Sequence, residues 1–75
     1  MRVKKPEGHS LYWVYAYDEK EAEYNFDTTR RLLEAEKIAK DMIEEGWHHA
    51  YVFFGDEDGA FTQYDYVDKF QMRSQ

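Results

Sequence analysis

The sequence predicts an α+β domain in which one helix packs on a four-stranded antiparallel sheet, with the elements in the order β-β-α-β-β. Two observations predict this fold. Four short stretches are rich in Tyr, Phe, Trp and Val, the residues that favour β-strands. Between the second and third stretches, apolar residues recur with the spacing of an amphipathic helix. The chain has 75 residues and no cysteine. We therefore expect a single domain whose core depends on aromatic side chains in place of disulfides.

The first hairpin is predicted from residues 9–18 and 22–27. The stretch HSLYWVYAYD is the most strand-like part of the chain, and AEYNFD alternates polar and aromatic residues as a half-buried strand does. Residues 19–20 are the expected turn, which would place Tyr15 opposite Tyr24.

The helix is predicted within residues 28–45. Its apolar stripe consists of Leu32, Ala35, Ile38, Ala39, Met42 and Ile43. One of the residues 27–29 could cap the helix start, although residues 28–31 could instead extend the second strand. Gly46 is expected to end the helix in a left-handed conformation, with Trp47 folding back onto it.

The second hairpin is predicted from residues 47–55 and 60–70, because Asp58-Gly59 between them is a strong turn signal. We prefer the spatial strand order 2-1-3-4, fully antiparallel, because it places the most apolar strand in the centre. The alternative order 1-2-3-4 needs a parallel pair joined by a right-handed crossover.

Both faces of this sheet are predicted to be aromatic, and one helix can cover only one of them. The expected core face carries Trp13, Tyr15, Tyr24, Phe26, Val52, Phe54 and Phe61. The expected open face carries Tyr12, Val14, Tyr51, Phe53, Tyr64 and Tyr66. The second hairpin could also present its two faces the other way round. Exposed Tyr-rich surfaces are typical of protein interfaces. The predicted apolar anchor for a partner is therefore Tyr12, Tyr51, Phe53, Tyr64 and Tyr66.

Acidic residues gather at the two predicted turns, which the preferred topology places at opposite ends of the sheet. They are Asp18, Glu19, Glu21, Glu23, Asp56, Glu57 and Asp58. The net charge is −6, so these residues would steer a protein partner with a basic surface. Duplex nucleic acid is disfavoured, because binding its phosphates requires clustered Lys and Arg. Two alternatives stay open: a homodimer formed through the Tyr-rich face, and a single-strand nucleic-acid binder that stacks bases on its rings.

No motif in the sequence indicates an enzyme, a cofactor or a metal site. Asp56 and Asp58 precede a glycine as in a calcium loop, but the remaining ligand positions are missing. His48 and His49 are adjacent on a predicted strand, so they should point to opposite faces. No serine lies in a nucleophile motif. We expect a non-enzymatic protein without cofactor or metal.

The domain is placed at residues 9–70, between a short basic arm at 1–8 and a polar tail at 71–75. The longest uncharged apolar run, residues 11–17, is too short to span a membrane. No apolar signal-peptide region follows the basic start. We therefore expect a cytoplasmic protein.

The overall layout resembles a class of small phage-encoded anti-defence proteins, including anti-CRISPR proteins. The resemblance is carried by an aromatic hairpin (SLYWVYAYDEKEAEYNF), an Ala-rich helix ending in Gly-Trp (LLEAEKIAKDMIEEGW) and a second hairpin (HAYVFFGDEDGAFTQYDY) in an acidic chain without cysteine. It implies a stoichiometric inhibitor that binds a host nucleic-acid-handling complex without chemistry. It assigns no functional residue.

Overall fold

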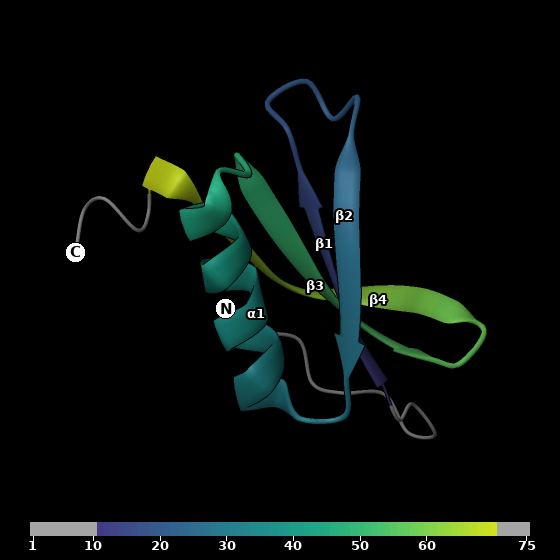
Figure 1. Ribbon diagram of the computed structural model, residues 1–75. Coiled ribbons are helices and arrows are strands. Elements are labelled where there is room, and N and C mark those ends of the chain that lie inside the picture. Colours follow the sequence, from purple (N-terminus) through teal and green to yellow (C-terminus); the bar gives the residue numbers. More distant parts are fainter. Residues whose placement is uncertain (1–10, 71–75) are drawn as a thin grey trace.

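The computed structural model describes residues 11–70, apart from the side chain of Phe61. The elements are β1 (Leu11–Tyr17), β2 (Tyr24–Thr29), α1 (Leu32–Glu45), β3 (His49–Asp56) and β4 (Gly59–Asp68). The strands form one antiparallel sheet in the order β2-β1-β3-β4 (Figure 1). The predicted fold and the preferred strand order are confirmed. The N-terminal arm, the polar tail and the core position expected for Phe61 lie outside the described residues.

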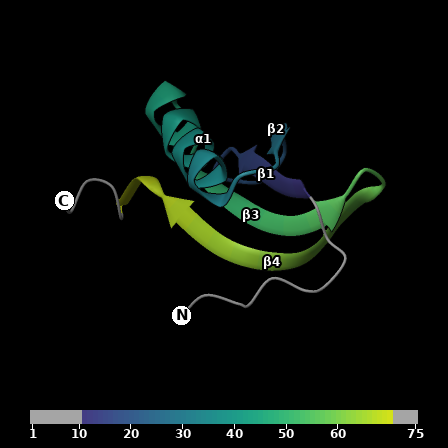
Figure 2. The same cartoon turned by 90° about the horizontal axis from the view of Figure 1, so that it is seen from below.

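The helix α1 lies on one side of the sheet, and the curved strand β4 forms one edge (Figure 2). Between α1 and the sheet is a core of small and branched side chains with a few large ones. Its buried members are Tyr12, Val14, Ala16, Ala35, Ala39, Met42, Ile43, Ala50, Val52, Phe54 and Val67. In the sheet, Ala16 lies opposite Ala50 and Val14 lies opposite Val52. None of these four side chains is exposed, so the core is centred on β1 and β3.

The core face of the first hairpin is the opposite of the predicted one. We expected Trp13 and Tyr15 to face the helix, but the buried side chains of β1 are Tyr12, Val14 and Ala16. The physical reason is the small size of the helix stripe. Ala35 and Ala39 permit close approach to the sheet only where the facing side chains are also small. A layer of indole and phenol rings would hold the helix away.

The turn between β1 and β2 spans residues 18–23, which is longer than the predicted 19–20. Asp18 organises this turn. Its main-chain carbonyl accepts a hydrogen bond from the N–H of Glu21 at 3.1 Å, and its Oδ1 accepts one from the N–H of Ala22 at 2.8 Å. Glu21 adopts a positive φ of 58°. A chain of L-residues rarely makes such a turn, so spacing alone did not reveal it.

The longer turn changes the register of the first hairpin. Tyr15 lies opposite Phe26, not opposite Tyr24 as predicted, and Trp13 lies opposite Thr28. Because the displacement is two residues, the side chains that were expected to share a face still share it.

The two ends of α1 differ from each other in how they are closed. None of the residues 27–29 caps the start; Arg31 occupies the N-cap position without a side-chain cap. Thr29 belongs to β2, where its hydroxyl accepts a hydrogen bond from the N–H of Arg31 and donates one to the carboxylate of Glu34. At the other end Gly46 has a φ of 125°, as predicted, and its N–H bonds the Ile43 carbonyl.

A bulge in β4 brings Tyr64 to the core side of the sheet. Asp65 lies opposite Val52 and Gln63 lies opposite Phe53, so Tyr64 is the extra residue between two pairs. Its ring lies 4.8 Å from that of Phe54. The prediction that Tyr64 lies on the open face was therefore wrong. A strict alternation along β4 cannot describe a strand that contains a bulge.

No helix in the described part of the chain has the length and apolar character needed to cross a membrane.

Candidate functional site

The sheet face opposite α1 carries a continuous layer of aromatic side chains from all four strands, which we call the aromatic face. Its members are Trp13, Tyr15, Tyr17, Tyr24, Phe26, Tyr51, Phe53 and Tyr66. They share a face because they alternate with core residues along the strands. Tyr24 and Phe26, on the edge strand β2, are 59% and 48% exposed. The core of α1 and the sheet lies entirely on the other side.

Tyr15 lies at the centre of this layer. Five neighbouring rings have centroids 5.6 to 6.5 Å from that of Tyr15, and they belong to Trp13, Tyr17, Tyr24, Phe26 and Phe53. These spacings are in the range where aromatic pairs attract each other, beyond the effect of burial. The rings therefore support one another and form a preorganised surface.

Trp13 is fixed at the end of the aromatic face near the β3–β4 turn. Its indole N–H donates a hydrogen bond to the main-chain carbonyl of Asp56 at 2.9 Å. Gly55 makes room for this arrangement. A Cβ at Gly55 would lie 2.8 Å from Cδ1 of Trp13 and 2.1 Å from the carbonyl oxygen of Gly59. Position 55 therefore requires glycine.

The opposite end of the aromatic face is held by Glu21 from the first turn. One carboxylate oxygen, Oε2, lies 2.7 Å from Nε2 of His49 and accepts a hydrogen bond from the hydroxyl of Tyr51 at 2.9 Å. These bonds, first from His49 and then from Tyr51, lower the pKa of Glu21. The positive φ of Glu21 turns its side chain toward the sheet.

His49 is buried although it lies on the same side of β3 as Tyr51. Its ring is enclosed by Tyr17 at 5.8 Å, Tyr51 at 5.6 Å and Tyr66 at 5.8 Å. An ionised carboxylate only accepts hydrogen bonds, so Nε2 of His49 must donate to Glu21. In a neutral His49 ring, Nδ1 is then an acceptor.

His48 supplies the partner for that nitrogen. The two Nδ1 atoms of His48 and His49 are 2.8 Å apart, which requires His48 to donate when His49 is neutral. We expected the two histidines to point to opposite faces. They do not, because His48 precedes β3 and is not bound by the alternation of the strand.

Several tyrosines around this network hold their protons more tightly than usual. Burial, followed by the hydrogen bond to Glu21, raises the pKa of Tyr51 to about 12. Burial also raises the pKa of Tyr66, with a further contribution from the charge of Asp68. For Tyr17, burial and then the charge of Glu21 raise the pKa. These hydroxyls therefore act as neutral hydrogen-bonding groups on the aromatic face.

The structure divides the predicted apolar anchor into two groups. Tyr51, Phe53 and Tyr66 lie on the aromatic face, as expected. Tyr12 and Tyr64 instead pack with Phe54 on the core side, and Tyr12 is only 7% exposed. Sequence reasoning placed the remaining members of the face in the core: Trp13, Tyr15, Tyr17, Tyr24 and Phe26. The two alanines of the helix stripe were the signal that could have identified them as the open side.

The predicted acidic residues lie at opposite ends of the sheet, as the preferred topology required, because Tyr17 pairs with His49 and Leu11 pairs with Gly55. Some of them stabilise their own turns. Asp18 accepts a main-chain hydrogen bond from Ala22, and Oδ1 of Asp56 accepts one from the N–H of Asp58 at 2.8 Å. The side chains that are exposed at the turns are Glu19, Glu21, Glu23, Glu57 and Asp58.

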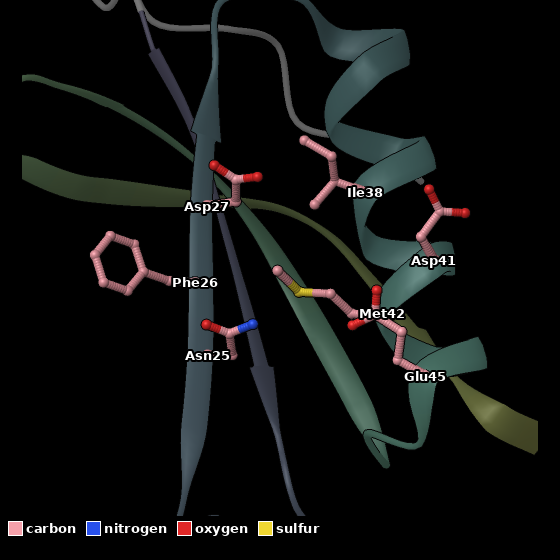
Figure 3. A pocket seen from close by; sticks show the side chains of 7 residues that line it. All are labelled: Asn25, Phe26, Asp27, Ile38, Asp41, Met42 and Glu45. Atoms are coloured by element: carbon pink, nitrogen blue, oxygen red, sulfur yellow. The ribbon is translucent and has the colours of Figure 1, made fainter.

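A shallow groove separates β2 from α1 on the helix side of the sheet (Figure 3). Met42 and Ile38 form its apolar floor. Asn25 and Asp27 approach it from β2, whereas Phe26 points away onto the aromatic face. The remaining lining residues are Asp41 and Glu45 of α1. Its volume of about 240 Å³ is below that of most small-molecule pockets, which hold roughly 300–1,000 Å³. The groove suits single side chains.

Within residues 11–70, no three or more His, Cys, Asp or Glu side chains are arranged to hold a metal ion. No family model matches the chain, and no curated protein or solved structure matches it either. What the protein does must therefore be inferred from the aromatic face and the charges around it.

Proposed function

We propose that this protein is a non-enzymatic protein-binding module that contacts its partner through the aromatic face. One observation carries the proposal: a continuous layer of mutually packed rings lies on the side of the sheet opposite α1, and its outer members Tyr24 and Phe26 are about half exposed. Exposed aromatic patches of this kind mark interaction sites in monomeric proteins. Tyr and Trp also supply large contact areas at low cost in conformational entropy.

The preorganisation of the rings supports the same function. Binding is weakened when side chains must be ordered at the interface. Here the rings of Trp13, Tyr15 and Phe53 are already held by their neighbours, and the Trp13 indole is fixed to the Asp56 carbonyl. A partner would therefore meet a surface that needs little rearrangement.

The charge distribution favours a protein partner with a basic surface. Within their bounds, the strands β1 to β4 contain no Lys or Arg. Acidic turns flank the sheet at both ends, with Glu19 and Glu23 at one end and Glu57 and Asp58 at the other. Such charges raise the rate at which a basic partner is encountered. Basic surfaces are typical of nucleic-acid-handling complexes, so the narrower form of the proposal is an inhibitor that occupies such a complex.

The test compares a variant of the aromatic face with a matched variant of the helix. Tyr24→Ser with Phe26→Ser removes two exposed rings from the face, and Leu33→Ser removes an 84% exposed apolar side chain from α1. The tagged proteins are used to capture partners from a host lysate, followed by mass spectrometry. We expect a partner that the wild type and Leu33→Ser retain and that the face variant loses. Equal capture by all three proteins would contradict the proposal.

Sedimentation at micromolar concentration identifies the case in which the partner is a second copy of this chain. A dimer that persists in Leu33→Ser but dissociates in the face variant would place a homodimer interface on the aromatic face. A monomer in all three proteins leaves a different protein as the partner.

A further inference from the structure

We propose that the partner adds a β-strand to the edge of β2, and that the added segment alternates apolar or aromatic residues with Lys or Arg. This inference rests on the proposed function and names the binding mode and the chemistry of the partner. It follows from the position of β2, from what lies on each of its two sides, and from the charges there.

The strand β2 has a neighbour, β1, on one side only in the described sheet. Its other side therefore presents main-chain N–H and C=O groups that an extended peptide can pair with. The other edge strand, β4, is less suitable. Its pairing with β3 is interrupted by two register shifts, and bulges of this kind discourage further strand addition. β2 is a regular strand of six residues.

The two faces of β2 border two different environments. Tyr24 and Phe26 extend onto the aromatic face, whereas Asn25 and Asp27 point into the groove toward α1 (Figure 3). A strand paired with β2 alternates its side chains between the same two environments. Its residues on one side would extend the layer of rings, and those on the other would enter the groove.

The groove side selects for basic residues. The groove carries the carboxylates of Asp27, Asp41 and Glu45 above a floor of Met42 and Ile38. A long basic side chain matches both features, because its methylene stem covers apolar surface while its charged end reaches the carboxylates. Lys37 lies 3.9 Å from Asp41 and offsets one of these charges, which leaves Asp27 and Glu45 as the main acceptors.

The same charges oppose pairing with a second copy of this chain. Two β2 strands placed edge to edge would bring two sets of acidic side chains together. None of the strands β1 to β4 could supply the alternating basic residues either, since they contain no Lys or Arg. A charge directed toward the core side of an edge strand is a known protection against self-pairing. Asp27 fits that description.

The first experiment uses synthetic peptides with isotope-labelled full-length protein. The probe is Tyr-Lys-Val-Lys-Tyr-Lys-Val with blocked ends, and the control is Lys-Lys-Lys-Tyr-Tyr-Val-Val, which has the same composition without alternation. We expect the alternating peptide to bind roughly tenfold more tightly. It should also protect the amides of residues 24–29 from hydrogen exchange. Equal binding of the two peptides, no binding of either, or shifts confined to β4 would overturn the inference.

Two peptides with N-methyl groups on alternate amides test the main-chain pairing directly. An extended peptide turns one set of its amides toward β2, so one of the two methylated peptides should lose binding and the other should keep it. If both bind like the parent peptide, strand addition is wrong. Amides of β2 that are already protected without any peptide would show an occupied edge and would also overturn the inference.

A matched pair of charge variants tests the role of the groove. Asp27→Asn with Asp41→Asn and Glu45→Gln neutralises the groove. Glu19→Gln with Glu44→Gln and Glu57→Gln removes the same charge elsewhere. We expect about a tenfold loss of affinity for the alternating peptide in the first variant and at most about a twofold loss in the second. Equal losses would show that only the overall charge matters. If the peptides fail while the Tyr24/Phe26 variant still loses its captured partner, strand addition is wrong and the proposed function stands.

Discussion

The carboxylate of Glu21 and the imidazole of His49 lie 2.7 Å apart, although 28 residues separate them in the chain. This contact connects the first turn to the end of β3 and encloses His49 beneath the tyrosines of the aromatic face. It therefore links the stability of the fold to the geometry of the proposed binding surface. Its energetic weight can be measured through pH.

The Glu21 contact predicts a loss of stability in acid. The hydrogen bonds from His49 and Tyr51 lower the pKa of Glu21 in the folded state. This contribution to stability is present above the ordinary glutamate pKa, about 4.3, and is lost as the pH falls through the lower folded value. We expect the free energy of unfolding of Glu21→Gln, measured in urea, to depend less steeply on pH in this range than that of the wild type. Glu19→Gln, which changes an exposed carboxylate of the same turn, should follow the wild type. Parallel curves for all three would contradict the role of Glu21.

Tyr51 predicts a second loss of stability in alkali. Burial and the bond to Glu21 raise its pKa to about 12 in the folded state, against an ordinary value of about 10. The contribution is complete below pH 10 and is lost as the pH rises toward 12, because only the unfolded chain ionises in that window. Tyr51→Phe should flatten this part of the stability curve. Tyr15→Phe, a control at the centre of the same face, should not flatten it to the same extent. A wild-type curve that is already flat between these pH values would contradict the prediction.

The placement of Tyr12 in the core predicts a contrast with Phe26. Tyr12 is 7% exposed and packs against Phe54, whereas Phe26 is 48% exposed on the aromatic face. Tyr12→Ala should therefore cost about 3–5 kcal/mol of unfolding free energy, as large-to-small core changes do. Phe26→Ala should cost less than half of that. The measurement is urea unfolding followed by far-ultraviolet circular dichroism. A larger cost at position 26 than at position 12 would reverse the assignment of the faces.

Gly55 predicts a steric effect at the end of the aromatic face. An alanine Cβ would lie 2.1 Å from the Gly59 carbonyl oxygen and 2.8 Å from the Trp13 ring, so the β3–β4 turn or the indole must move. We expect Gly55→Ala to lower the free energy of unfolding by about 1–3 kcal/mol and Gly55→Val to lower it further. The amide of Asp56 should also shift in NMR spectra as the Trp13 bond is disturbed. Unchanged stability in both variants would contradict this reading of the turn.

The topology could be predicted from the sequence, whereas the faces could not. β1 is apolar along its whole length, which places it in the centre of the sheet, and the turn signals divide the chain correctly. The same apolar character leaves both sides of β1 suitable for a core, with Val14 and Ala16 on one side and Trp13 and Tyr15 on the other. The decision lies in the helix, because Ala35 and Ala39 allow close approach only to the smaller side.

Polar residues in β2 added to the error. Asn25 and Asp27 made their side of the strand look solvent-facing, and this side is in fact the helix side. They are tolerated there because β2 is the edge strand and its helix-facing side opens into the groove. The contact between Glu21 and His49 could not be predicted either. It depends on the positive φ of Glu21 and on a turn whose length no simple spacing rule reveals.

The last prediction concerns single-stranded nucleic acid, which rings on an open sheet can bind by stacking. The aromatic face has the rings but lacks the cations, since β1 to β4 contain no Lys or Arg. We therefore expect no salt-sensitive gel shift with single-stranded oligonucleotides. Thr28 and Gln63 lie opposite Trp13 and Phe53 in the sheet, so Thr28→Lys with Gln63→Lys adds two cations beside the rings. This variant should gain weak, salt-sensitive binding, because charge and not ring geometry is the limiting factor. Binding by the wild type would contradict the preference for a protein partner, and it would identify the rings of β1 and β3 as a base-stacking surface.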